Sequence, residues 1–199
     1  METQAGLLVE LESILKPVEP AELFPLAQPL EVELGCGDAS FLVNYARRHP
    51  DRNFIGVERL LGRLRKLDRK GRHLAPANLR GVQIESSYFL KYLLPHGSAS
   101  ALHIYFPDPW PKKRHRKKRL INEAFPQLAQ ASLAPAGVVY LRTDDADYFE
   151  QMTAVFSASR GFRQIETPSD LAEILTDFER EFNARGIGTR RAAYQSNAE

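Results

Sequence analysis

The chain has 199 residues, 43% of them hydrophobic, and its 27 Lys and Arg against 25 Asp and Glu give a formal net charge of +2. This length predicts one well-cored domain over 29–199, preceded by an N-terminal lead over 1–28. The first residues carry no basic stretch and no continuous apolar run, which argues against a signal peptide or membrane span and predicts a cytoplasmic protein without a membrane partner. The single cysteine, Cys36, excludes an internal disulfide and a cysteine-based zinc cluster, and the five histidines lack metal-ligand spacing, so no metal is expected.

Short apolar stretches alternate with longer amphipathic segments along the chain. Strands are predicted over 30–34, 53–57, 82–85, 102–106 and 138–142, with helices over 41–49, 60–74, 88–94, 120–133 and 148–158. This alternation predicts βαβ units and therefore an α/β fold with a mainly parallel sheet.

The part of the chain beyond Gly161 carries a weaker pattern. It predicts a strand over 162–166 and a helix over 170–185 that stops at Gly186. Within that helix, Thr176 to Glu179 has the form of a capping box, which allows a new helix to begin there. Residues 1–28 and the tail after Tyr194 are expected to be the most mobile parts.

The first predicted strand turns into a helix through Gly35 and Gly37. Glycines there allow a tight turn and a close approach of the backbone to a ligand, and Glu58, at the end of the second strand, can accept hydrogen bonds from ribose hydroxyls. A dinucleotide is disfavoured, because Ser40 stands where its motif needs glycine and because Glu33 would repel phosphate. A cationic ligand with an adenosine and no phosphate fits better, although such glycine turns also occur for purely structural reasons.

Asp108 lies between two prolines and directly before the seven cations of the basic run, residues 112–119. The prolines exclude a helix interior or a central strand, so Asp108 is predicted on a stiff loop past the carboxyl end of a strand, where open α/β sheets bind ligands. Without those seven cations the net charge of +2 would become −5. The concentration of charge predicts nucleic-acid binding, with a solvated face as the structural alternative, and seven phosphate contacts would give a log-log salt slope of roughly −6 at most.

These residues together resemble the bacterial tRNA (guanine-N7)-methyltransferases. The blocks 33–37, 106–115 and 176–179, with Gly186 and Tyr194 downstream, carry the resemblance in chain order. It implies a Rossmann-like class I methyltransferase fold, with helices on both faces of the sheet and an antiparallel final strand. It also implies a monomer or homodimer that transfers a methyl group from S-adenosylmethionine to N7 of the variable-loop guanosine, position 46, of tRNA.

The resemblance assigns roles to single residues by matching position. Asp108 would be the catalytic aspartate. Cofactor contacts are expected from Glu33, Gly35, Gly37, Glu58, Glu85 and Asp108. Substrate contacts are expected from Lys112, Asp144, Thr176, Asp177, Phe178 and Glu179. Contacts to tRNA phosphates are expected from Lys113, Arg114, Arg116, Lys117, Lys118 and Arg119.

The sequence departs from the commonest family pattern at two positions. Ala39 stands where many relatives have a third glycine, and Glu85 where an aspartate or asparagine is more usual. Both changes bear on the fine geometry of the adenosine pocket.

Guanine N7 carries a free lone pair, so methylation there needs positioning of the base and no prior removal of a proton. We expect Asp144 or Glu179 to accept hydrogen bonds from guanine N1–H and N2–H₂, and Asp108 to stabilise the positive charge that moves onto the base. Two purely structural interpretations remain open. Asp144 and Asp145, after the fifth predicted strand, would cap the next helix, and Trp110 would pack the loop instead of stacking on a ligand.

Two other functions compete with this one. The first is an amino-methyltransferase acting on another base of RNA or DNA, since 107–110 loosely resembles the Asp/Asn-Pro-Pro-aromatic motif of those enzymes. The second is a non-catalytic RNA-binding module that retains the sheet. The intact acids Glu33, Glu58 and Asp108 argue against the second.

Overall fold

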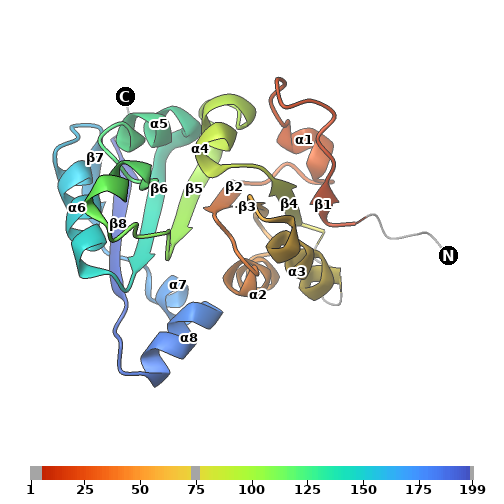
Figure 1. Cartoon of the computed structure of the whole chain (residues 1–199). Helices are drawn as coiled ribbons and strands as arrows, with labels where there is room; N and C mark the ends of the chain where they lie inside the picture. The colour runs from red at the N-terminus through yellow and green to blue at the C-terminus, as the bar shows by residue number, and fades with distance from the viewer. Residues whose placement is uncertain (1–5, 73–76, 198–199) are drawn as a thin grey trace. The chain divides into compact units, whose positions relative to one another are not determined.

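The first of two structural units, Met1–Pro95, is built on parallel strands. The computed structural model describes residues 6–72 and 77–197. Within them the strand order of this unit is β1 (Leu8–Val9), β4 (Leu79–Gln83), β3 (Asn53–Glu58) and β2 (Leu30–Leu34). Helices α2 (Ser40–Arg48) and α3 (Leu61–Arg72) pack against each other and against β3 (Figure 1). The remaining helices are α1 (Pro20–Leu23), α4 (Ser86–Tyr88) and the π-helix η1 (Phe89–Leu93).

Close packing of α2 and α3 on this sheet depends on Gly56 in β3. A Cβ atom added there would lie 2.9 Å from side-chain carbons of both Leu42 on α2 and Leu67 on α3. Both leucines are fully buried. Because interiors are packed without spare volume, glycine is what allows both helices to approach the strand.

The lead predicted over 1–28 packs onto this unit from residue 7 onward. Leu7, Val18 and Phe24 are buried, and the backbone N–H of Val18 donates to the carbonyl of Leu93 at 2.7 Å. Strand β1 pairs with β4 through Leu8. A strand of two residues is too short to show a period in the sequence, so β1 was not predicted.

The second unit, His96–Glu199, combines parallel and antiparallel pairing. Its strand order is β5 (Ala99–Tyr105), β6 (Leu133–Thr143), β8 (Arg190–Ser196) and β7 (Phe162–Ile165), and β8 runs antiparallel to both of its neighbours. Helix α6 (Ala146–Ser157) packs against β6, β7 and β8, and α5 (Phe125–Ser132) packs against β6. Helices α7 (Ser169–Glu173) and α8 (Asp177–Ala184) lie toward the carboxyl ends of β5 and β6 (Figure 1).

The predicted mainly parallel α/β architecture with an antiparallel final strand is confirmed. The helix predicted over 120–133 begins only at Phe125, because Pro126 occupies its first turn. The predicted helix over 170–185 is two helices, and Thr176 caps the second. The predicted end of a helix at Leu74 lies outside the described residues.

The end of the chain is part of the sheet, although mobility was expected after Tyr194. Strand β8 reaches Ser196, and the buried ring of Tyr194 stacks on Phe156 with 4.5 Å between centroids. Tyr194 therefore packs α6 against the sheet.

Candidate active site

The glycine turn of the first unit is fixed by hydrogen bonds from the neighbouring strand. Gly35 and Gly37 have φ of 77° and 55°, a region that glycine enters without strain. The N–H groups of Gly35 and Cys36 both donate to the carbonyl of Val57, at 2.8 and 2.9 Å. The N–H of Gly37 donates to Oε2 of Glu58 at 3.1 Å. Because β2 and β3 are parallel, their carboxyl ends place this turn and Glu58 at the same edge.

Negative charge is concentrated at that edge. Glu33 and Glu58 are only 3% and 6% exposed. Burial raises the pKa of the Cys36 thiol well above its usual value, and the nearby charges of Glu33, Glu58 and Asp38 raise it further. Carboxylates gathered at one edge attract positive charge, so these residues fit a cationic ligand such as the sulfonium cofactor expected from the sequence.

The two positions that depart from the family pattern have defined roles. Ala39 precedes α2 with φ of 57°, the left-handed conformation that a glycine would adopt without strain. Glu85 is the N-cap of α4, and its carboxylate accepts hydrogen bonds from the N–H groups of Ser87 and Tyr88 at 3.0 and 2.8 Å. Glu85 thus fixes the chain after β4 through a cap that aspartate or asparagine would also provide.

The loop that carries Asp108 follows β5 in the second unit. Asp108 is exposed, and its Oδ1 accepts a hydrogen bond from the N–H of Trp110 at 3.1 Å. Phe106 and Trp110, on either side, have φ of 50° and 43°. The ring of Phe106 lies 6.3 Å from that of Phe178 and 5.8 Å from that of Phe182, centroid to centroid. These contacts bring the Asp108 loop together with α8, where the predicted substrate residues lie.

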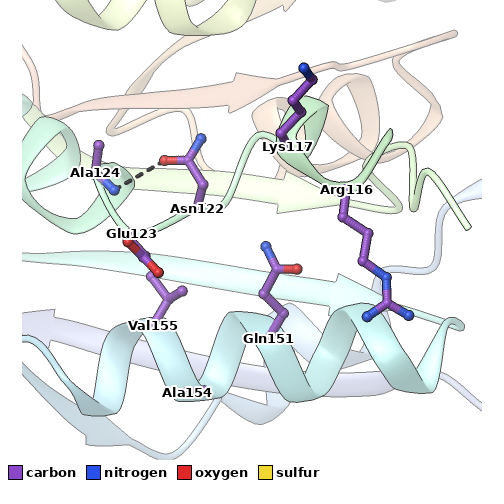
Figure 2. A pocket seen from close by; sticks show the side chains of 8 residues that line it. All are labelled: Arg116, Lys117, Asn122, Glu123, Ala124, Gln151, Ala154 and Val155. Atoms are coloured by element: carbon purple, nitrogen blue, oxygen red, sulfur yellow. Dashed lines mark hydrogen bonds between the residues drawn. The ribbon is translucent and has the colours of Figure 1, made fainter. Parts of the chain in front are cut away.

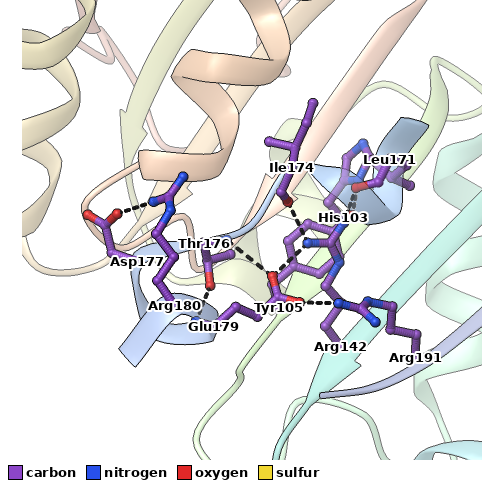
Figure 3. A network of polar contacts seen from close by, with 10 residues as sticks. All are labelled: His103, Tyr105, Arg142, Leu171, Ile174, Thr176, Asp177, Glu179, Arg180 and Arg191. Carbon is purple, nitrogen blue, oxygen red and sulfur yellow. Dashed lines mark hydrogen bonds and ion pairs between the residues drawn. The ribbon is translucent and has the colours of Figure 1, made fainter. Parts of the chain in front are cut away.

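The segment Thr176 to Glu179 begins α8 with a complete capping box. The N–H of Glu179 donates to Oγ1 of Thr176 at 2.9 Å, and the N–H of Thr176 donates to Oε2 of Glu179 at 3.1 Å (Figure 3). Asp177 and Phe178 between them are exposed, and Asp177 forms an ion pair with Arg180. The cap therefore leaves Asp177 and Phe178 exposed while Thr176 and Glu179 are buried.

Glu179 is the centre of a buried charge cluster that sequence reasoning missed. Its side chain is 0% exposed, and its oxygens accept hydrogen bonds from Arg142 and Arg191, each at 2.8 Å (Figure 3). Arg142 also donates to the carbonyls of Leu171 and Ile174, and its guanidinium lies 4.2 Å from the centre of the Tyr105 ring. The charged Arg142 at the end of the apolar strand 138–142 indicates a buried partner, but the sequence does not identify Glu179, which lies 37 residues away.

Asp144 and Asp145 follow β6 and have separate roles. Asp145 is the N-cap of α6, and its Oδ1 accepts from the N–H of Tyr148 at 2.7 Å. Asp144 does not cap the helix and is partly exposed. The helix-capping interpretation therefore applies to Asp145 and leaves Asp144 available to a ligand.

Most of the basic run forms the 3₁₀ helix η2 (Lys113–Lys118). Its exposed members are Lys112, Lys113, Arg114, Lys117 and Lys118. Trp110 packs against this helix, with Nζ of Lys118 4.7 Å from its ring centre and His115 perpendicular to it at 5.8 Å. Lys112 precedes the helix as its N-cap residue.

Two arginines of the run are not free on the surface. Arg116 pairs with Asp147 at 2.7 Å. Arg119 is only 2% exposed, and its guanidinium is enclosed by the loop and α6. The expectation that Arg119 contacts phosphate does not fit this structure, because a buried and fully engaged guanidinium cannot reach a ligand at the surface.

A groove in the second unit separates part of the basic run from α6. Arg116 and Lys117 line it from η2, Asn122 and Glu123 from the segment before α5, and Gln151 from α6 (Figure 2). Its lining includes both signs of charge and the apolar Ala154 and Val155.

Within residues 6–72 and 77–197, no group of three or more His, Cys, Asp or Glu side chains is placed to hold a metal ion. In the same part of the chain, no helix has the length and apolar character needed to span a bilayer.

Comparison with known proteins places these features in a family. The family model described as Putative methyltransferase matches residues 27–192. A tRNA (guanine-N(7)-)-methyltransferase of Syntrophotalea carbinolica is 32% identical over 94% of this chain and 82% of its own length. The protein of the same name from Saccharophagus degradans is 37% identical over 78% of this chain and 68% of its own.

Solved structures share the fold at low identity. The 16S rRNA methyltransferase KamB superposes with a TM-score of 0.62 at 13% identity, covering 90% of this chain and 92% of its own. The [4+2]-cyclase SpnF superposes with a TM-score of 0.60 at 10% identity, covering 90% and 79%. Since proteins with such different names share it, the fold alone does not determine the reaction.

Proposed function

Because the chain belongs to the family of bacterial tRNA (guanine-N(7)-)-methyltransferases, we propose that it methylates N7 of guanosine at position 46, in the variable loop of tRNA. The structural observation that best supports this proposal is a ring contact between Phe106, two residues before Asp108, and Phe178 of the capped segment. This contact joins the two sequence blocks that set the family apart from other methyltransferases. A cytoplasmic location follows from the tRNA substrate.

S-adenosylmethionine supplies the methyl group when it is bound. Glu33 and Glu58 provide buried negative charge beside the turn of Gly35 and Gly37, which suits the cationic end and the ribose of this cofactor. Glu85 contributes through the start of α4. These residues hold the cofactor, and the family pattern adds Asp108 to them.

Guanine recognition needs a carboxylate that accepts from N1–H and N2–H₂. Asp144 and Glu179 are the two candidates, and their surroundings differ. Glu179 is enclosed by Arg142, Arg191 and the Thr176 N–H, whereas Asp144 is partly exposed after β6. This difference favours Asp144 as the acceptor for guanine N1–H and N2–H₂. Glu179 then has an indirect role, because it holds the start of α8 in place.

Asp108 has an electrostatic role, which is to stabilise the positive charge that forms on the base. The lone pair of N7 attacks without losing a proton, and positive charge develops on the base as the methyl group arrives. An exposed carboxylate on a rigid loop is suited to stabilise that charge, and loss of one such group commonly lowers kcat by about 100-fold or more. Asp108→Asn is therefore expected to lower kcat more than it changes cofactor affinity.

The exposed cations of η2 supply the binding surface for tRNA phosphates. Lys112, Lys113, Arg114, Lys117 and Lys118 are exposed around Trp110 and the Asp108 loop. Lys117 extends this surface to the rim of the groove, which is also lined by Arg116 in its ion pair with Asp147. Binding should therefore weaken with salt, with a log-log slope smaller in magnitude than the roughly −6 that all seven cations would give.

The test is methyl transfer from labelled S-adenosylmethionine to two unmodified tRNA transcripts, one with guanosine and one with adenosine in the variable loop. We expect label in 7-methylguanosine, identified by nucleoside mass spectrometry, from the first transcript alone. Label in an amino-methylated nucleoside would instead establish the competing amino-methyltransferase. Binding of tRNA without transfer, and without thermal stabilisation by the cofactor, would establish a non-catalytic module.

A further inference from the structure

Arg119 ends the basic run but faces the interior of the second unit. Its Nε donates to the carbonyl of Pro109 at 2.7 Å, Nη1 to Oε1 of Gln151 at 2.7 Å, and Nη2 to Oδ2 of Asp147 at 2.6 Å. Its guanidinium also lies 4.6 Å from the ring centre of Tyr148. The planar fork of arginine makes these bonds in several directions at once, which the single ammonium of lysine cannot reproduce.

Two of the three α6 residues that surround Arg119 are themselves bonded to the segment before α5. Gln151 lines the groove beside Arg116 (Figure 2), and its Nε2 donates to the carbonyl of Ile121 at 2.8 Å. The hydroxyl of Tyr148 accepts from the N–H of Ile121 at 2.9 Å. Arg119 therefore connects the Pro109 carbonyl to helix α6.

The loop at the other end of this connection needs external support. Phe106 and Trp110 both have φ in the left-handed region, which is unfavourable for bulky side chains. Inside the loop, the Trp110 N–H to Asp108 bond is local. Phe106 is held by Phe178 and Phe182 of α8, and the bond from Arg119 to Pro109 holds the other side of Asp108.

We propose that Arg119 is a positioning residue for Asp108, which it holds through the Pro109 carbonyl against Asp147 and Gln151 of α6. It acts through the loop and does not contact tRNA. This inference rests on the proposed function only where turnover is measured, because the position of the loop can be measured without it. Trp110 is the only tryptophan in the chain and lies on this loop, so its fluorescence reports the loop directly.

The first experiment compares Arg119→Lys and Arg119→Gln with Lys117→Gln, an exposed cation of the same run. Both Arg119 variants are expected to increase acrylamide quenching of Trp110 about twofold and to lower kcat by 10-fold or more, with KM for tRNA within threefold. Their dependence of kcat/KM on salt should match that of the parent protein. Lys117→Gln should instead raise KM and flatten the salt slope by about 0.9, as expected when one phosphate contact is lost.

A second variant, Asp147→Asn, keeps the proposal testable if the Arg119 variants do not fold. Asp147 is exposed and contacts Arg116 and Arg119. If only charge mattered, removing this acid would strengthen tRNA binding and leave kcat unchanged. Positioning predicts the opposite for turnover: kcat falls about threefold or more, Trp110 quenching rises, and the effect of Asp147→Asn is reduced in the Arg119→Lys background.

The outcomes separate the proposal from its alternatives. Parental kcat and quenching in Arg119→Lys, with a raised KM and a flatter salt slope in Arg119→Gln, would make Arg119 a phosphate contact and overturn the proposal. Parental quenching in Asp147→Asn together with parental kcat would overturn it as well. If the parent protein forms no 7-methylguanosine but the Arg119 variants change Trp110 quenching, the proposed function fails while the positioning of the loop stands.

Discussion

Oε2 of Glu58 accepts a hydrogen bond from the backbone N–H of Gly37 at 3.1 Å, and Oε1 of the same carboxylate accepts from Leu60 at 2.8 Å. The residue expected to hold the cofactor ribose therefore also holds the glycine turn on which the cofactor depends. Each carboxylate oxygen has two lone pairs, so these bonds leave acceptor capacity for ribose hydroxyls. Preorganisation of the turn and recognition of the ligand thus share one side chain.

Glu58→Gln tests this double role. The amide can accept at one oxygen only, and its NH₂ group would face a backbone N–H that now lacks an acceptor. We expect affinity for S-adenosylhomocysteine to fall by about 10-fold, as for the loss of one charge-assisted hydrogen bond. Calorimetric titration measures this, with Asp51→Asn, an exposed acid of the same unit, as the matched control. Equal affinities in all three proteins would show that Glu58 is dispensable.

The backbone of the turn gives a second prediction. Ala39→Gly should stabilise the protein by up to about 1 kcal/mol, since the strain of an L-residue at φ of 57° slightly exceeds the entropy that glycine adds to the unfolded chain. Gly35→Ala should destabilise it by about 1–2 kcal/mol, because φ there is 77°.

Gly62→Ala in α3 is the control for these changes. Added Cβ atoms at Gly35 and Gly62 both meet nothing within 4 Å, so the two sites differ in backbone conformation and not in available space. Helix propensity predicts stabilisation by about 0.5 kcal/mol for Gly62→Ala. Urea unfolding measures all three variants, and shifts of the same sign at Gly35 and Gly62 would contradict the conformational explanation.

Local patterns in the sequence predicted much of the fold and of the cofactor site. Alternating apolar segments predicted β2, β3, β5 and β6, and the Thr176 capping box predicted the start of α8. In each case the signal and the structure lie within a few residues of each other. The glycine turn and Glu58 are predictable for the same reason, because parallel strands align their carboxyl ends.

Long-range contacts could not be predicted in this way. Arg142 and Arg119 were expected to end a strand and to bind phosphate, yet both are buried by partners about 30 residues away. The position of β8 was not predicted either, since its residues include Arg190, Arg191 and Gln195 and show no simple alternation, and only the resemblance implied an antiparallel final strand. The sequence alone does not distinguish an arginine that is exposed at the surface from one that is enclosed by a helix formed later in the chain.

Cys36 predicts a dependence of stability on pH. Burial and three nearby carboxylates raise its pKa above the ordinary value of 9.0, so the folded protein binds the thiol proton more tightly than the unfolded chain does. This contribution is complete below pH 9 and is lost as the pH rises from 9 toward the folded pKa, by at most about 1.4 kcal/mol per pH unit. Tyr148, whose pKa burial raises to about 12, acts in the same direction above pH 10.

Urea unfolding at pH 7, 9 and 10.5 measures this dependence. The parent protein should lose more stability above pH 9 than Cys36→Ala, which lacks the thiol. In the native state at pH 8 the thiol should also react slowly with a disulfide reagent, and quickly in urea, because thiolate is the reactive form. Equal pH dependence in both proteins would show that Cys36 does not carry the effect.

Substitutions of Glu179 and Asp144 should have different effects, with loss of stability for Glu179 and loss of guanine recognition for Asp144. Glu179→Gln keeps the capping box, since glutamine serves at that position, but it removes the charge between Arg142 and Arg191. Leaving the buried Arg142 without its carboxylate partner should destabilise the protein by about 3 kcal/mol, whereas Arg191 is partly exposed and should contribute less. Asp144→Asn should change stability by less than about 0.5 kcal/mol, because its side chain is partly exposed and caps nothing.

Asp144→Asn should lower methyl transfer to tRNA although it hardly changes stability. Without its carboxylate, guanine N1–H and N2–H₂ lose their acceptor, so kcat/KM for tRNA should fall by about 10-fold or more while affinity for S-adenosylhomocysteine stays at the parental level. Urea unfolding, calorimetric titration and transfer to the guanosine and adenosine transcripts measure the three effects in the same two variants. A stable Glu179→Gln protein that has lost guanine selection, beside an Asp144→Asn protein that retains it, would move base recognition to Glu179. Arg142 and Arg191 would then have to release its carboxylate when tRNA binds, because both of its oxygens are engaged in the free protein.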